Sequence, residues 1–79
     1  MSEFSIDSIL RESKPYVITI ECKNGFIYRG KLIHIEENMN CILKEAFVIK
    51  KKKVQKLTLV FLRGSNISMF IIPDILIHF

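Results

Sequence analysis

The sequence has few of the residues from which metal and redox sites are built: two cysteines, two histidines and no tryptophan among 79 residues. Cys22 and Cys41 stand 19 positions apart, and neither belongs to a CxxC pair. Zinc sites need clustered cysteine and histidine ligands, so this spacing excludes such a metal centre, and no motif indicates a cofactor. We therefore expect both thiols to be small core residues in a reducing compartment.

Long apolar runs are also missing. None approaches the roughly 20 residues of a membrane span, while a hydrophobic content of 49% excludes a disordered chain. The first ten residues carry Glu3 and Asp7 where a signal peptide has its basic region, so we expect no secretory signal. A chain of 79 residues has room for one hydrophobic core. The sequence predicts one small domain over residues 1–79, without a membrane partner.

Positive charge is concentrated in the second half of the chain. The net charge of +4 divides into −1 for residues 1–49 and +5 for residues 50–79, where Asp74 is the one acidic residue. Four consecutive lysines, Lys50 to Lys53, account for most of this excess. Such a run is more often a solvated loop, but a local positive face also suits a polyanion such as RNA or DNA.

The spacing of apolar residues changes along the chain. Ile6, Ile9 and Leu10 have helical spacing, and Pro15 follows them, which predicts a short amphipathic helix over about residues 5–13. The later segments have the spacing of two that is typical of β-strands, separated by turn residues such as Asn24-Gly25. The strands are expected around residues 18–22 and over 26–36, 41–49, 54–62 and 67–72, with loops at 37–40, 50–53 and 63–66.

These elements predict an all-β fold with a small N-terminal helix. Gly30 lies inside the second strand and indicates a bend or bulge, so we expect that strand to change its core face partway along. Five antiparallel strands with such a bend favour a strongly bent open barrel of the SH3-like or OB-like kind. The segments 57–62 and 67–72 are apolar at nearly every position. This favours pairing with another chain, which in a closed series makes a ring; cover by the chain's own helix and tail is the alternative.

Two motifs resemble the Sm protein family. The pattern Gly25-x-x-Tyr28-x-Gly30-x-Leu32, followed by the polar residues 37–40, is similar to the first Sm motif, placed over about residues 16–41. The run 62–67 is similar to the second Sm motif, placed over about residues 57–72. Within the family, the runs 28–33, 38–41 and 71–74 most resemble the D-three branch of the spliceosomal Sm core proteins.

The resemblance implies a helix on a five-stranded bent sheet and a ring of seven different Sm subunits. In such a ring the fourth strand of one subunit pairs with the fifth strand of the next. It also implies binding to a uridine-rich single-stranded site of small nuclear RNA, in pre-mRNA splicing. The implied neighbours are the Sm B and Sm G subunits, and the implied location is the nucleus, with assembly in the cytoplasm possible.

By the same resemblance, the RNA-binding residues are Asn38 and Asn40 in the first loop and Arg63 and Gly64 in the second. An asparagine amide can match the donor and acceptor of a uracil edge, a guanidinium can stack on the base, and glycine lets the backbone approach closely. Many relatives have an aromatic residue in place of Asn38, so we expect a weaker contribution from it. Glu37 is expected to tie the first loop together through its carboxylate.

Three alternatives remain open. A Sm-like ring subunit in RNA decay, or one that binds terminal oligouridine, shares much of the pattern. An SH3-like protein-binding module needs an exposed aromatic groove, for which the sequence has only two tyrosines. An enzyme could use Cys22 or Cys41 with His34 as nucleophile and base, but all three lie in expected strands and no third group orients them. We therefore expect no catalytic residue.

Overall fold

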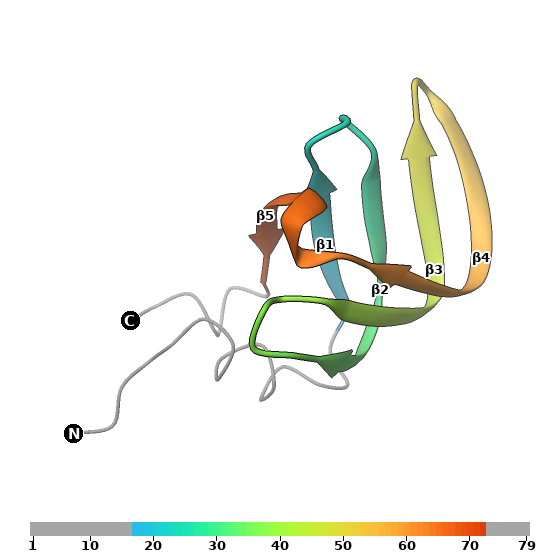
Figure 1. Ribbon diagram of the computed structural model, residues 1–79. Helices are drawn as coiled ribbons and strands as arrows, with labels where there is room; N and C mark the ends of the chain where they lie inside the picture. Colours follow the sequence, from blue (N-terminus) through green and yellow to red (C-terminus); the bar gives the residue numbers. More distant parts are fainter. Residues whose placement is uncertain (1–16, 73–79) are drawn as a thin grey trace.

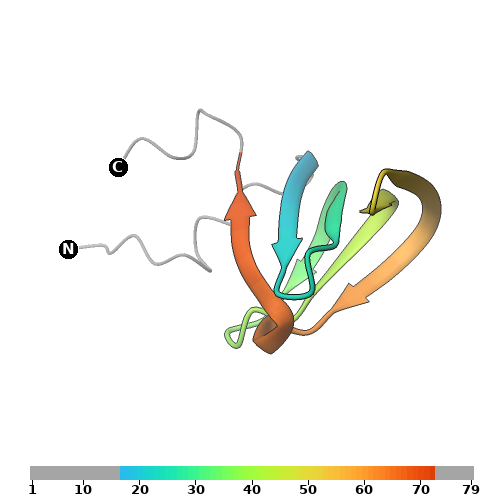
Figure 2. The same cartoon turned by 90° about the horizontal axis from the view of Figure 1, so that it is seen from above.

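The computed structural model describes residues 17–72, which form one antiparallel sheet of five strands. The strand order is β4-β3-β2-β1-β5, so β4 and β5 are the two edges of a curved sheet (Figure 1, Figure 2). This confirms the all-β, strongly bent open sheet, while the helix expected over residues 5–13 lies outside the described residues. The elements are β1 Val17–Cys22, β2 Ile27–Ile35, β3 Cys41–Lys50, β4 Lys53–Leu62, a 3-10 turn η1 Gly64–Asn66 and β5 Ile67–Ile71.

Two tight turns join β1 to β2 and β3 to β4. In the β1–β2 turn Gly25 has a φ of 90°, and the Asn24 side-chain oxygen accepts a hydrogen bond of 2.9 Å from the Phe26 N–H. The β3–β4 turn is narrower than the predicted loop 50–53, because Lys50 and Lys53 still pair across the ladder. The turn itself therefore consists of two residues.

The sheet bends where β2 and β3 come unusually close. A Cβ on Gly30 would lie 2.7 Å from the Ala46 Cβ and 2.9 Å from the Ala46 Cα, closer than side chains pack. The pairing register shifts between Arg29 and Lys31, opposite Glu45, whose φ is 51°. An extra residue in one strand bends that strand and increases its twist, so this bulge produces the local curvature.

A second register shift, between Leu32 and His34, puts one extra residue into β2 and so changes which alternate residues of the strand face the core. Leu32 and Ile35 are both buried although they are an odd number of residues apart, while Ile33 between them is 40% exposed. The expected change of core face is thus confirmed. It occurs after Leu32 and not at Gly30, because the bulge at Leu32 reverses the alternation.

The concave side of the sheet holds the hydrophobic core. Alternate residues of β1 and both cysteines belong to it, which confirms that the thiols are core residues. Burial raises the pKa of the Cys41 thiol to about 12, with a smaller contribution from Cys22. The buried cluster consists of Ile18, Ile20, Cys22, Leu32, Ile35, Cys41, Leu43, Ala46, Leu62 and Ile72.

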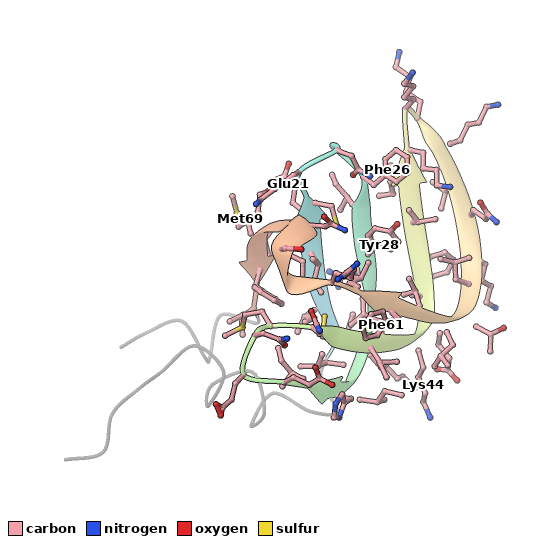
Figure 3. The ribbon with its side chains drawn as sticks, in the orientation of Figure 1. Glu21, Phe26, Tyr28, Lys44, Phe61 and Met69 are labelled. Atoms are coloured by element: carbon pink, nitrogen blue, oxygen red, sulfur yellow. The ribbon has the colours of Figure 1, made fainter. Side chains whose placement is uncertain are left out.

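The two edge strands leave large apolar side chains exposed. On β4 the exposed fraction is 59% for Leu59 and 55% for Phe61, and on β5 it is 50% for Met69. Met69 points away from the sheet at the β5 edge (Figure 3). An edge strand with apolar side chains and free backbone groups is suited to pairing with another chain. Between residues 17 and 72 no helix has the length and apolar character to cross a membrane.

Candidate nucleic-acid interface

The fold brings together two loops that are distant in the sequence. Residues 36–40 join β2 to β3, and residues 63–66 join β4 to β5. The link between them is a hydrogen bond across 24 residues of sequence, from Gly64 to Asn40. All four predicted RNA-binding residues therefore belong to one pair of adjoining loops.

Asn40 holds the two loops together through its side-chain amide. Its Oδ1 accepts a hydrogen bond of 2.7 Å from the Gly64 N–H, and its Nδ2 donates one of 3.3 Å to Glu36 Oε1. The Asn40 backbone carbonyl also accepts a bond of 2.9 Å from the Glu36 N–H. An amide group has two acceptor lone pairs and two N–H donors, so one of each is left for a ligand. The amide is thereby fixed in orientation before any ligand binds.

Gly64 lies directly against the backbone of the first loop. A Cβ at this position would overlap the Asn38 carbonyl oxygen and would come within 2.9 Å of the Met39 Cβ. The sequence predicts that the Gly64 backbone approaches a base closely. In this structure it lies close to the backbone of the first loop. A larger residue would push the loops apart and break the hydrogen bond to Asn40.

Asn38 and Arg63 are the exposed members of the site. The Asn38 Oδ1 accepts a weak hydrogen bond of 3.2 Å from the Asn40 N–H, which stabilises the loop locally. Within residues 17–72 the guanidinium of Arg63 forms no hydrogen bond or salt bridge to another side chain. Its planar face is therefore free to stack on a base or to contact a phosphate.

The carboxylate that ties the first loop is that of Glu36, so the expectation for Glu37 is wrong. The Glu36 N–H donates to the Asn40 carbonyl, and the Glu36 carboxylate accepts from the Asn40 side chain. The Glu36 carbonyl accepts a bond of 2.9 Å from the Met39 N–H. Its other carboxylate oxygen is 3.3 Å from His34 Nε2. Glu37 is exposed and makes no side-chain hydrogen bond within residues 17–72. The physical reason is that Glu36 and Asn40 face each other across the two ends of this loop, whereas Glu37 lies within the loop and is exposed to solvent.

Within residues 17–72, Cys22, Cys41 and His34 do not form a nucleophilic site. Burial raises the pKa of Cys22 as well as that of Cys41, which disfavours the thiolate that a nucleophile needs. His34 is exposed and faces Glu36. Among residues 17–72 no group of three potential ligands could hold a metal ion. Tyr28, the one tyrosine in this range, packs half-buried against the core and forms no open aromatic groove there.

A bent five-stranded sheet with two clasped polar loops and apolar edges defines the class of an Sm-type protein. Residues 8–72 match the LSM domain family. The chain belongs to this family, as its two motifs indicate.

Among its relatives are proteins of the D-three branch. The chain is 42% identical over 69 residues to the small nuclear ribonucleoprotein Sm D3 of Schizosaccharomyces pombe, covering 86% of this chain and 71% of that protein. It is also 42% identical over 71 residues to the small nuclear ribonucleoprotein SmD3b of Arabidopsis thaliana, covering 89% of this chain. It spans 54% of the length of that plant protein. The similarity to the D-three branch is thus confirmed.

Solved structures of Sm proteins have the same fold. A Pyrococcus Sm protein in complex with a uridine heptamer superposes with a TM-score of 0.77 at 28% identity, covering 90% of this chain and 100% of that one. A heptameric archaeal Sm protein superposes with a TM-score of 0.78 at 21% identity, covering 85% and 98%, and supports the fold alone.

Proposed function

We propose that this chain is a non-catalytic, RNA-binding core subunit of the spliceosomal small nuclear ribonucleoproteins. It joins six other Sm subunits in a ring around a uridine-rich single strand of small nuclear RNA, with Sm B and Sm G as neighbours, in the nucleus. The observation that carries the proposal is the clasp between Asn40 and Gly64, which unites the predicted site residues. The similarity to Sm D3 proteins supports it.

The residue roles follow from what the clasp leaves free. The remaining N–H and lone pair of the Asn40 amide face the uracil edge, which offers one donor beside its carbonyl acceptors. Arg63 stacks its exposed guanidinium on the same base, and Asn38 adds a weaker polar contact. Gly64 acts through the loop, because its N–H sets the direction of the Asn40 side chain.

The exposed apolar residues of β4 and β5 support the ring. Because these strands are opposite edges of one sheet, the β4 edge of one subunit can pair with the β5 edge of the next. Repetition of that contact closes a ring when each step has the right rotation. The ring then places the loops of all subunits around one opening, where successive bases can each occupy a site.

Arg63→Ala tests the base site without disturbing the clasp, since the side chain is exposed. The ring is reconstituted with its Sm partners, and binding to a uridine heptamer is measured. Loss of stacking is expected to cost about 1 to 3 kcal/mol, roughly a 5- to 150-fold weaker affinity. Lys44→Ala is the matched control, since it removes one exposed charge from β3. Equal affinity of wild type and Arg63→Ala, with both rings intact, would refute the base site.

The second candidate is a Sm-like ring in RNA decay or terminal oligouridine binding. The chain is 33% identical over 69 residues to a protein of Dictyostelium discoideum named as a probable U6 snRNA-associated Sm-like protein LSm4, covering 85% of this chain and 39% of that protein. Native mass spectrometry of the complex purified from its own cells separates the two. Sm B and Sm G among the subunits support the spliceosomal ring, and Sm-like subunits in their place overturn it.

A further inference from the structure

The β1–β2 and β3–β4 turns both carry exposed lysines and lie at the same end of the sheet. Both turns lie at the upper end of the molecule in Figure 1, opposite the β2–β3 loop. The two turns touch through Lys50, whose Nζ lies 5.0 Å from the centre of the Phe26 ring. This group, the basic hairpin end, consists of the exposed residues Lys23, Lys50, Lys51, Lys52 and Lys53.

In the part of the chain that the structure describes, no acidic residue pairs with the lysines of the basic hairpin end. The segments 22–35 and 46–73 contain no aspartate or glutamate. Glu21, which precedes the first turn, forms no ion pair with these lysines within residues 17–72. The ion pairs in that range lie elsewhere, between Lys31 and Glu45 at 2.8 Å and between His34 and Glu36. Five exposed cations at one end of the sheet, none of them in an ion pair with another described residue, create a local positive potential.

The backbone of the β3–β4 turn is strained for the residues it carries. Lys51 has a φ of 46° and Lys52 a φ of 72°, both in the left-handed region. A two-residue hairpin of this geometry strongly favours Asn-Gly, and lysine adopts it less readily. Lysine at both positions therefore works against the turn's conformation, and strain of this kind is retained where a side chain has a function.

We propose that the basic hairpin end contacts the phosphate backbone of RNA outside the uridine tract. This inference rests on the proposed function. The loop site and the turn lie at opposite ends of β3, which at about 3.3 Å per residue separates them by roughly 30 Å or less, given the bend of the strand. An RNA held at Asn40 therefore reaches the lysines only with flanking nucleotides. Because lysine ammonium groups bind the phosphate charge and not the base edges, this contact is independent of the RNA sequence.

The pair of substitutions Lys51→Asn and Lys52→Gly tests this directly. It removes two charges and installs the residues that the turn geometry favours, so the hairpin is expected to become more stable while RNA binding becomes weaker. Opposite changes in stability and affinity cannot arise from misfolding. The matched control is Lys44→Gln with Lys56→Gln, which removes the same charge from exposed positions within β3 and β4.

Two RNAs are compared on the reconstituted ring: a uridine heptamer, and the same tract with a mixed-sequence extension at each end. On the extended RNA, the turn variant is expected to flatten the dependence of log affinity on log salt by about 1.4, if each lysine contacts one phosphate. At about 0.1 M salt this corresponds to roughly 25-fold weaker binding. On the heptamer, the turn variant and the wild type should bind equally.

The outcomes separate the two levels of the proposal. If the turn variant and the control have the same salt dependence on the extended RNA, the basic hairpin end does not contact RNA and the inference is overturned. The same holds if both RNA affinities are unchanged but a protein partner is lost from the purified complex. If the wild-type ring does not bind the heptamer, the proposed function itself fails.

Discussion

Asn40→Asp is the most informative single substitution, because it removes one of the two hydrogen bonds of the Asn40 side chain, that to Glu36, and keeps the other, that from Gly64. The new carboxylate still accepts from the Gly64 N–H, which now lies at 2.7 Å from Oδ1. It can no longer donate to Glu36 Oε1, at present 3.3 Å from Nδ2. The substitution therefore turns an attraction within the first loop into a repulsion.

The magnitude follows from three contributions. Loss of a hydrogen bond to a charged group costs about 1.5 kcal/mol at an exposed site, at the lower end of the usual range. Two unit charges about 3.3 Å apart repel by about 1 kcal/mol at the dielectric constant of water. A charge-assisted bond to the Gly64 N–H returns about 1 kcal/mol. The losses exceed the gain, so we expect a net destabilisation of about 1 to 2 kcal/mol.

Urea unfolding measures this change, at equal protein concentration and subunit composition because assembly shifts apparent stability. Adding Glu36→Gln to Asn40→Asp supplies an amide donor in place of the second carboxylate, so the double variant should recover most of the loss. Its uridine affinity should stay low, since a carboxylate cannot donate to a uracil carbonyl. Asn40→Asp with wild-type stability, or a double variant no more stable than the single one, would show that the loop is not held by this bond.

Two further predictions concern the bend and the core. Gly30→Ala should lower the unfolding free energy by about 1 to 3 kcal/mol, because the new Cβ meets Ala46. Adding Ala46→Gly should recover only part of this loss of unfolding free energy in urea titrations, since the Cα of residue 46 stays 2.9 Å from the new Cβ. Complete recovery would contradict the close contact between the strands. Burial raises the pKa of Cys41 from 9.0 to about 12, so above pH 9 the folded chain retains a proton that the unfolded chain releases, and stability falls as the pH rises toward 12. Between about pH 8 and pH 10 this loss of unfolding free energy is about 1.4 kcal/mol. The Cys41→Ala variant should lack this loss when its unfolding free energy is measured at both pH values. An equal fall in unfolding free energy in wild type and variant would disprove it.

Much of the fold is readable from local patterns. The alternation of Ile18, Ile20 and Cys22 predicts a half-buried strand, and Asn24-Gly25 predicts the turn that follows. Both lie in the structure where the pattern places them. Such features depend on neighbours within a few residues, so the sequence contains the information directly. The apolar character of the last two expected strands predicts pairing with another chain, and it is the structure that places β4 and β5 at the two edges of the sheet.

The candidate site is readable only in part. The residue types of the two loops and their resemblance to the Sm motifs indicate Asn38, Asn40, Arg63 and Gly64. The assignment of the loop carboxylate to Glu37 fails, since a shift of one residue decides whether a side chain faces the loop or the solvent. The strain at Lys51 and Lys52 was also not visible, because a run of four lysines does not show which two form the turn.

By itself the sequence determined the family, the order of the strands along the chain, the basic second half and the residue types available for a nucleic-acid site. The tertiary structure alone decided which of these residues meet. The bond between Asn40 and Gly64 spans 24 residues, and it forms because Cys41 pairs with Leu62 in the β3–β4 ladder, which places the residue before β3 beside the residues after β4. A hydrogen bond requires placement within a few tenths of an ångström, and over that distance only the complete packing of the strands sets the position of both partners.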